Sequence, residues 1–250
     1  MLERARIEKT TDLKIWKQIV FFVIGLFGLT VISLFIQIIV QLAARRAIVS
    51  DYDYQTFMGS TTFNMIVNGS TYLIIAVIFL ILMKDDTNEF FKSFKGWKPY
   101  VAAAIGFSAI LTFNLFYNLI LSATGAVISD NANESSLNSI VSDFPFLSLL
   151  IFALIGPIVE EFTYRVGLFS LLKRVHISLA YVVTIIVFTF IHFDFQSNNM
   201  VNELLNIPFY MFAAATFCFL YHRFGLASSI SAHVTNNLLS IGTAIIASFK

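Results

Sequence analysis

Seven apolar runs constrain the fold of this chain more than any other feature of its sequence. A helix needs roughly 17–25 predominantly apolar residues to cross the hydrocarbon layer of a bilayer. Because 58% of the 250 residues are hydrophobic and only 12% are charged, a soluble fold would lack the polar side chains to cover its surface. The sequence therefore predicts an all-α, polytopic membrane protein of about seven transmembrane helices, with a polar catalytic cavity in the C-terminal helices. The expected spans are Ile19–Ala43, Phe63–Met83, Tyr100–Ala123, Leu147–Leu172, Leu179–Phe193, Ile207–Tyr221 and Leu226–Ser248.

Basic residues between these runs predict the orientation. Cytoplasmic loops carry an excess of lysine and arginine. With seven spans, the basic N-terminal tail and the basic loops after the second, fourth and sixth spans fall on one side, and the acidic segment Ile128–Phe144 falls on the other. We therefore expect a cell-membrane protein with a cytoplasmic N-terminus. The supporting residues are Arg4, Arg6, Lys9, Lys14, Lys17, Lys84, Lys92, Lys95, Lys98, Lys173, Arg174 and Arg223, and the dissenting ones are Arg45, Arg46 and Lys250.

The remaining segments suggest a single domain. Residues 1–98 hold the tail, two spans and a cytoplasmic segment, and residues 99–250 hold the expected catalytic core. Segment Asp85–Trp97 is predicted either as an amphipathic helix in the inner interface or as a loop with aromatic anchors. Segment Ile128–Phe144, rich in Ser and Asn, is the longest loop and the expected mobile element. The net charge of +1 provides no field for nucleic acid, and the single Cys218 excludes an internal disulfide.

Two adjacent carboxylates and an arginine interrupt the fourth span, in Gly156–Arg165. A charge at membrane depth costs several kcal/mol and usually marks function. Pro157 is expected to kink or restart the helix, which places Glu160 and Glu161 at the positive end of a half-helix. Glu161 and Arg165 are four residues apart and are predicted to pair. Glu160 points about 100° away, so it is the better candidate for proton transfer, and a purely structural Glu–Arg pair is the alternative.

Two later spans add polar groups that suit catalysis. His192 ends the run Phe188–His192. His233 and Asn237 are at i and i+4, so they project from one helical face and can donate hydrogen bonds to a developing oxyanion. A single histidine is weak evidence for an active site. Acids, histidines and an amide on three separate spans together predict one.

These residues, in this order, resemble the three motifs of the CAAX-protease and bacteriocin-processing family, also called the Abi family. They are Glu-Glu-x-x-x-Arg, Phe-x-x-x-His and His-x-x-x-Asn, and the resemblance covers roughly Ala153–Leu239. It implies an intramembrane endopeptidase of the type II CAAX prenyl protease kind. It further implies that Glu160 and His192 activate a water, that His233 and Asn237 stabilise the oxyanion, and that Glu161 and Arg165 support the site.

The resemblance leaves the metal and the substrate open. Two histidines and a glutamate (Glu160, His192 and His233) can bind zinc, but Asn237 would then lack a role, so a metal-free mechanism is favoured and zinc is the alternative. The composition is similar to that of bacterial members, whose roles include bacteriocin immunity, peptide maturation and modulation of membrane sensor proteins. We therefore expect a peptide or membrane-protein substrate in the bilayer. A non-proteolytic immunity or regulatory protein and a proton-coupled transporter are the alternative classes.

Overall fold

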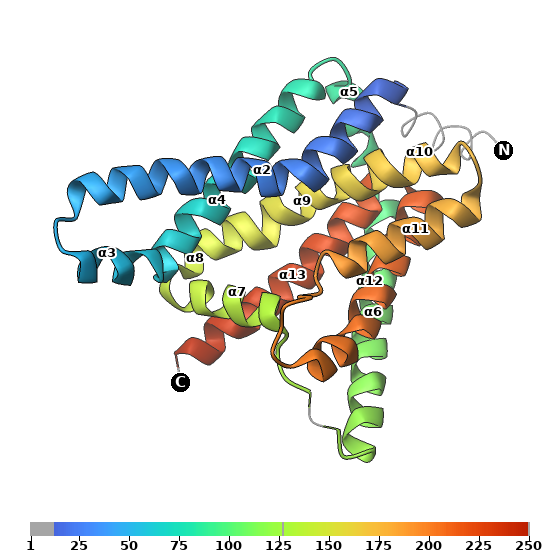
Figure 1. Cartoon of the computed structure of the whole chain (residues 1–250). Coiled ribbons are helices and arrows are strands. Elements are labelled where there is room, and N and C mark those ends of the chain that lie inside the picture. Colours follow the sequence, from blue (N-terminus) through green and yellow to red (C-terminus); the bar gives the residue numbers. More distant parts are fainter. Residues whose placement is uncertain (1–12, 127, 250) are drawn as a thin grey trace.

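The computed structural model describes residues 13–126 and 128–249, and these ranges form helices joined by turns, without a β-strand. Within these ranges, six helical stretches are long and apolar enough to cross a membrane, and a seventh, α11, is apolar but shorter. The predicted all-α, multi-pass membrane class is therefore confirmed (Figure 1). In chain order the elements are α2 (Ile15–Ala47), α3 (Asp51–Met58), α4 (Thr61–Leu82), α5 (Thr87–Ser93), α6 (Lys98–Ala123), α7 (Ala132–Asp143), α8 (Pro145–Ser148), η1 (Leu149–Ile155), α9 (Gly156–Glu161), η2 (Phe162–Phe169), α10 (Ser170–Lys173), α11 (Ile177–Phe190), α12 (Met200–Phe224) and α13 (Leu226–Ser248).

Most span boundaries agree with the predicted ones, and two differ in ways that matter for the site. The fifth span ends earlier than expected, because α11 stops at Phe190 and leaves His192 in the turn beyond it. The sixth was expected to be short, over Ile207–Tyr221, but α12 runs for 25 residues from Met200. Its polar first turns are buried against another loop of the chain, which a hydropathy pattern cannot anticipate.

The predicted restart at Pro157 is wrong. Residues 145–173 form one continuous helical stretch (α8, η1, α9, η2 and α10), with right-handed helical dihedral angles on both sides of α9. Proline lacks an N–H and crowds the carbonyl one turn back, and here the turn before it widens into the π-helix η1 instead of breaking. The N–H of Gly156 reaches the carbonyl of Ile151, five residues back. Glu160 and Glu161 are therefore in a helix interior and not at a half-helix terminus.

Of two predictions for the connecting segments, the loop over Ile128–Phe144 is wrong, and a helix is present in part of Asp85–Trp97. Segment Ile128–Phe144, expected to be the longest loop, is mostly the helix α7, whose first turn is capped by the side chain of Asn131. Within Asp85–Trp97 the helix is only α5, and its Phe90 packs on Phe162 in the protein core. An aromatic face that looked suited to a membrane interface is thus partly used for tertiary packing.

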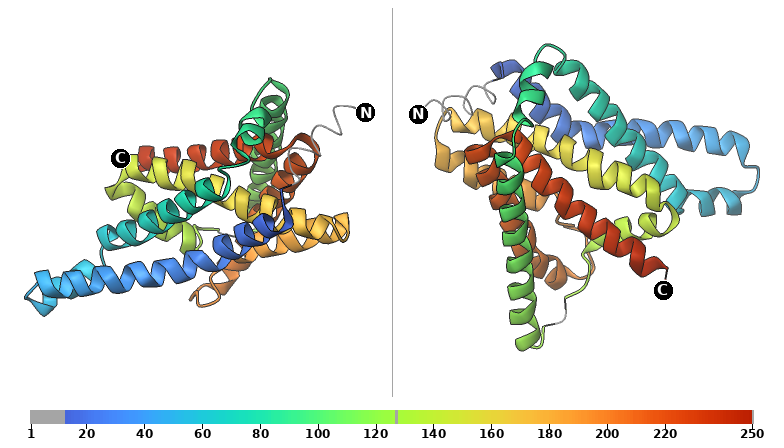
Figure 2. Two further views of the ribbon diagram at one scale, coloured as in Figure 1. Left: turned by 90° about the horizontal axis from the view of Figure 1, so that it is seen from above. Right: turned by 180° about the vertical axis from the view of Figure 1, so that it is seen from behind.

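The N-terminal helices lie directly against the segment that bears the carboxylates (Figure 2). A Cβ at Gly167 of η2 would lie 2.8 Å from the backbone N of Phe22 in α2, and one at Gly25 would overlap the side chain of Thr163. Glycine therefore permits a close approach of α2 to η2. Phe21 and Phe162 are buried at this contact, in the largest core cluster.

Several basic segments meet at one end of the molecule, where α5, α10 and the start of α2 lie together in Figure 1. The Lys17 ammonium donates to the carboxylate of Asp86 at 2.5 Å, and the Arg174 guanidinium donates to the Gln18 side chain at 3.2 Å. This arrangement is compatible with the predicted orientation. The basic residues Arg4, Arg6, Lys9 and Lys250 lie outside the described residues.

Candidate active site

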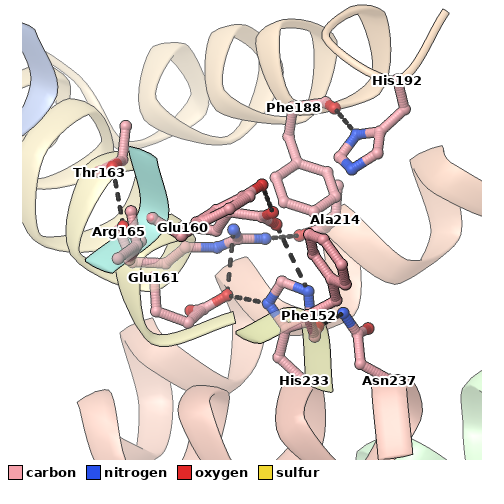
Figure 3. Close-up of polar contacts among 12 residues, drawn as sticks. Phe152, Glu160, Glu161, Thr163, Arg165, Phe188, His192, Ala214, His233 and Asn237 are labelled. Atoms are coloured by element: carbon pink, nitrogen blue, oxygen red, sulfur yellow. Dashed lines mark hydrogen bonds and ion pairs between the residues drawn. The ribbon is translucent and has the colours of Figure 1, made fainter. Parts of the chain in front are cut away.

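A buried ion pair forms the centre of the site, as predicted from the i, i+4 spacing. Nη1 of Arg165 lies 3.1 Å from Oε1 of Glu161, and both side chains are fully buried. The same Glu161 oxygen accepts a hydrogen bond from Nδ1 of His233 at 2.9 Å (Figure 3). Glu161 is therefore bound by two basic groups that arrive from its own helical stretch and from α13.

Arg165 is enclosed by aromatic rings. Its guanidinium carbon lies 4.6 Å from the ring centroid of Phe188 and 5.4 Å from that of Phe217, and one N–H donates to the carbonyl of Ala214 at 3.4 Å. Guanidinium groups stack favourably on aromatic faces, and more so when both are desolvated. The surroundings thus hold this cation in place without a second carboxylate.

Glu160 has different partners from its neighbour. Its Oε2 lies 3.6 Å from Nε2 of His233, and its Oε1 accepts a long hydrogen bond of 3.5 Å from the hydroxyl of Tyr72 in α4. A separation of 3.6 Å is longer than a direct hydrogen bond, so these two atoms face each other without being bonded. The Glu160 side chain retains 11% exposure, whereas that of Glu161 has none. Of the two acids, Glu160 is the one that a water or a substrate can reach.

His233 lies between the two carboxylates, and its ring stacks on Phe217 with centroids 4.4 Å apart. A carboxylate accepts only, so the bond to Glu161 places a proton on Nδ1 and directs Nε2 toward Glu160. A protonated His233 would donate from both nitrogens. The cluster has two carboxyl groups and one guanidinium, so a single extra proton on His233 or Glu160 makes it neutral.

His192 is adjacent to this centre but separate from it. Its Nδ1 bonds to the carbonyl of Phe188 at 2.8 Å, which leaves Nε2 as the basic nitrogen of the neutral ring. The Phe188 ring contacts both His192 and His233, at 4.9 and 5.8 Å, and it lies between His192 and the glutamates in Figure 3. His192 is close enough to Glu160 for an electrostatic interaction.

Asn237 lies one turn after His233 on α13, as the spacing predicts, and its Nδ2 donates to the carbonyl of Phe152 in η1 at 3.1 Å. An amide nitrogen has two N–H groups, so this bond orients the side chain and leaves a second donor. The site therefore gathers four residues closely (Glu160, Glu161, Arg165 and His233), with His192 and Asn237 at its margins.

Two tyrosines near Glu160 were missed by the sequence analysis. Tyr164 is four residues after Glu160, and that spacing could have indicated a shared helical face. Its hydroxyl is buried without a hydrogen-bond partner among the described residues, and it is close enough to Glu160 for an electrostatic interaction. Tyr72 has no local signal, because α4 comes to the site only through tertiary packing.

The zinc alternative names Glu160, His192 and His233 as ligands. Within residues 13–126 and 128–249 no three His, Cys, Asp or Glu side chains are grouped as metal ligands. Nε2 of His233 lies 3.6 Å from Oε2 of Glu160, whereas the Phe188 ring lies between His192 and the glutamates, so a three-ligand site with an open position would require His192 to move.

The fold and the site together define a multi-pass membrane protein with a buried acid–histidine–arginine centre in its C-terminal helices. Residues 142–239 match the family model described as type II CAAX prenyl endopeptidase Rce1-like. The matched segment is less than half of the chain, but it contains every motif residue, and it confirms the resemblance to the CAAX proteases. Comparisons with curated proteins and with solved structures found no match.

Proposed function

We propose that this protein is an intramembrane endopeptidase that hydrolyses peptide bonds with a water activated by Glu160. One observation carries the proposal: Glu160 and His233 face each other across 3.6 Å inside the helical bundle, and Glu161 orients His233 from its other nitrogen. A general base must lie within reach of its proton, directly or through one water. The family match supports the same reaction class.

In the proposed reaction, Glu160 takes a proton from water and the resulting hydroxide attacks the scissile carbonyl carbon. The carbonyl oxygen becomes an oxyanion, which accepts hydrogen bonds from the Nε2–H of a protonated His233 and from the free N–H of Asn237. Glu160 then returns the proton to the leaving nitrogen, so the products are a carboxylic acid and an amine. His192 acts with Glu160 in handling that proton, while Glu161 and Arg165 hold His233 in orientation.

The proposed substrate is a peptide or a segment of a membrane protein, because the carboxylates are buried among helices that could cross a bilayer. By the resemblance to bacterial relatives, the setting is peptide maturation, bacteriocin immunity or signalling through a membrane sensor protein. The protein lies in the cell membrane with a cytoplasmic N-terminus. The proposed mechanism is metal-free.

The decisive experiment compares the peptides of cells that express the wild-type chain, Glu160→Gln or His192→Ala. The control is Asp53→Asn, which neutralises an exposed carboxylate on α3. Peptides that appear with wild type and control but with neither site variant would identify the substrate. Wild-type cleavage by both variants, at equal membrane abundance, would refute the protease and favour a binding or transport role.

A further inference from the structure

Residues just before α7 contact His192 from outside its own helix. Asn131 is 1% exposed, and its Nδ2 donates both to the backbone carbonyl of His192, at 3.3 Å, and to the hydroxyl of Tyr210, at 3.0 Å. Its Oδ1 accepts from the N–H of Glu134 at 2.9 Å and so caps α7. This one side chain therefore joins the start of α7 to the turn that carries His192.

Tyr210 of α12 completes the contact. Its ring stacks on the His192 imidazole, with centroids 4.7 Å apart and planes 19° apart, and its hydroxyl donates to Glu134 at 3.3 Å. The imidazole also contacts the ring of Phe188 and bonds to the Phe188 carbonyl through Nδ1. The ring orientation is thus set by two aromatic contacts and one hydrogen bond, and only Nε2 is left for chemistry.

Further bonds fix the two loops to each other. The Glu203 carboxylate is 2% exposed and accepts from the N–H groups of Ala132 and Asp194, at 3.0 and 3.2 Å. Asn202 accepts from the N–H of Ser129 at 2.9 Å. Buried polar groups that are satisfied in this way make a segment rigid. Residues 129–131, just before α7, are therefore a fixed support and not a loose connection.

We propose that Asn131 and Tyr210 are positioning residues that hold His192 in its working orientation. His192 lies two residues beyond the end of α11, in a turn where its N–H donates to the Thr189 carbonyl at 3.2 Å. The regular helix has ended there, so contacts from other elements contribute to the orientation of its ring. The inference rests on the proposed function, in which His192 acts with Glu160. Asn131 lies outside the segment that matches the family model, so the match does not assign it.

The test distinguishes two functions of the Asn131 side chain, which are its N–H donors to His192 and Tyr210 and its oxygen that caps α7. Asn131→Ser keeps a side-chain oxygen for the cap but removes both N–H donors. Asn199→Ser is the matched control, because Asn199 also caps a helix, α12, and is exposed. With a quenched peptide built on the Glu160-dependent cleavage site, Asn131→Ser is expected to lower kcat by roughly 10-fold to 100-fold, since small misplacements have such effects. KM should remain within about two-fold, and the control should match wild type.

Two further variants test the ring. Tyr210→Phe keeps the stack and removes the hydroxyl, whereas Tyr210→Leu removes both, so kcat should fall in the order wild type, Tyr210→Phe, Tyr210→Leu. Wild-type kcat in both Asn131→Ser and Tyr210→Leu would overturn the proposal. So would a rise in KM at unchanged kcat, because that would mean that these residues bind the substrate.

A spectroscopic measurement keeps the inference separate from the protease proposal. In chains labelled with [15N]histidine, a His192 with fixed Nδ1–H gives distinct shifts for its two nitrogens, assigned by comparison with His192→Ala. Asn131→Ser should average them and Asn199→Ser should not. Unchanged His192 signals in Asn131→Ser would refute positioning even if Glu160→Gln abolishes cleavage. If Glu160→Gln cleaves normally, the protease proposal fails, and the averaging of the two His192 nitrogen shifts in Asn131→Ser still decides whether Asn131 positions His192.

Discussion

At the scale of single residues, the two adjacent glutamates differ because each has its own partners. Glu161 binds Arg165 and His233 and has no exposure, so its charge is used within the protein. Glu160 is bound only loosely, by Tyr72 and across a gap by His233. A rotation of one residue along a helix is enough to separate a structural acid from one available for chemistry.

Removing only the guanidinium of Arg165 should lower the stability of the protein more than removing both charges of the Glu161–Arg165 ion pair. Arg165→Met leaves Glu161 as a buried carboxylate with a single basic neighbour, and breaking a buried pair from one side typically costs about 3–5 kcal/mol. In Glu161→Gln/Arg165→Met no unpaired charge remains. We expect the single variant to have the lower apparent Tm in detergent. A double variant that is less stable than the single one would contradict this account.

Tyr164→Phe should separate stability from activity. A buried hydroxyl without a partner costs about 1–3 kcal/mol, so its removal should raise the apparent Tm, while the ring contact with Phe188 is kept. If the hydroxyl donates to reacting atoms beside Glu160, kcat should fall by roughly 10²-fold. Tyr117→Phe, which removes a hydroxyl bonded to the carbonyl of Leu205, is the control. A higher Tm with unchanged kcat would limit Tyr164 to packing.

At the scale of elements, the carboxylates are carried by a helix that π-helical stretches flank on both sides, η1 before and η2 after. Such stretches are frequent at functional sites, because they turn side chains away from a regular helical register. The α2 helix packs closely on η2 at Gly167 and Gly25. The N-terminal half of the chain thus supports the site although the family match does not include it.

Gly167→Ala should destabilise the protein although alanine is the better helix former. Alanine gains about 1 kcal/mol in a helix interior, but a Cβ here would lie 2.8 Å from a backbone atom of α2, and overpacking costs about 1–3 kcal/mol. Gly242→Ala on α13 is the matched control, since nothing lies within 4 Å of its added Cβ. Thermal unfolding in detergent should show a lower Tm for Gly167→Ala and an equal or higher one for the control. Equal Tm values for Gly167→Ala and the control would mean that α2 shifts enough to accommodate the added methyl group.

The stability of the folded protein should depend on pH through Glu134, at the start of α7. Burial first, and then the charge of Asp130, raise the pKa of the half-buried Glu134 carboxyl above its ordinary value. In the pH window from the unfolded pKa of about 4.3 up to the raised value, the folded state binds more protons. Stability from this group is therefore greatest below the window and falls as pH rises through it. Glu134→Gln should flatten the Tm profile across this window and raise Tm near neutral pH; an unchanged profile would exclude Glu134 as its source.

At the scale of the whole molecule, the basic segments at one end and α7 at the other suggest which end faces the cytoplasm. In a Cys218→Ala background, which removes the only cysteine, a cysteine at Lys95 should react with an impermeant maleimide only after the membrane is opened. A cysteine at Ser136 of α7 should react in intact cells. The reverse labelling would invert the proposed topology.

A chelator decides the mechanism class for the whole protein. If catalysis is metal-free, incubating the purified protein with a strong zinc chelator should leave kcat unchanged, whereas Glu160→Gln should abolish it. The position of the Phe188 ring, between His192 and Glu160, is the structural basis of this expectation. Loss of activity with the chelator and recovery on adding zinc would show that the three residues rearrange around a metal.

The amino-acid sequence by itself determined the membrane class, the approximate spans and the Glu161–Arg165 pair, because each follows from local composition or from helical spacing. It also contained the three motifs. Only the tertiary structure decided that the helix continues through Pro157, that segment 128–144 becomes α7, and that His233 lies between both glutamates while His192 is held from Asn131 and Tyr210. Those outcomes depend on contacts between helices far apart in the chain, and no local pattern of residues encodes which buried polar groups will meet.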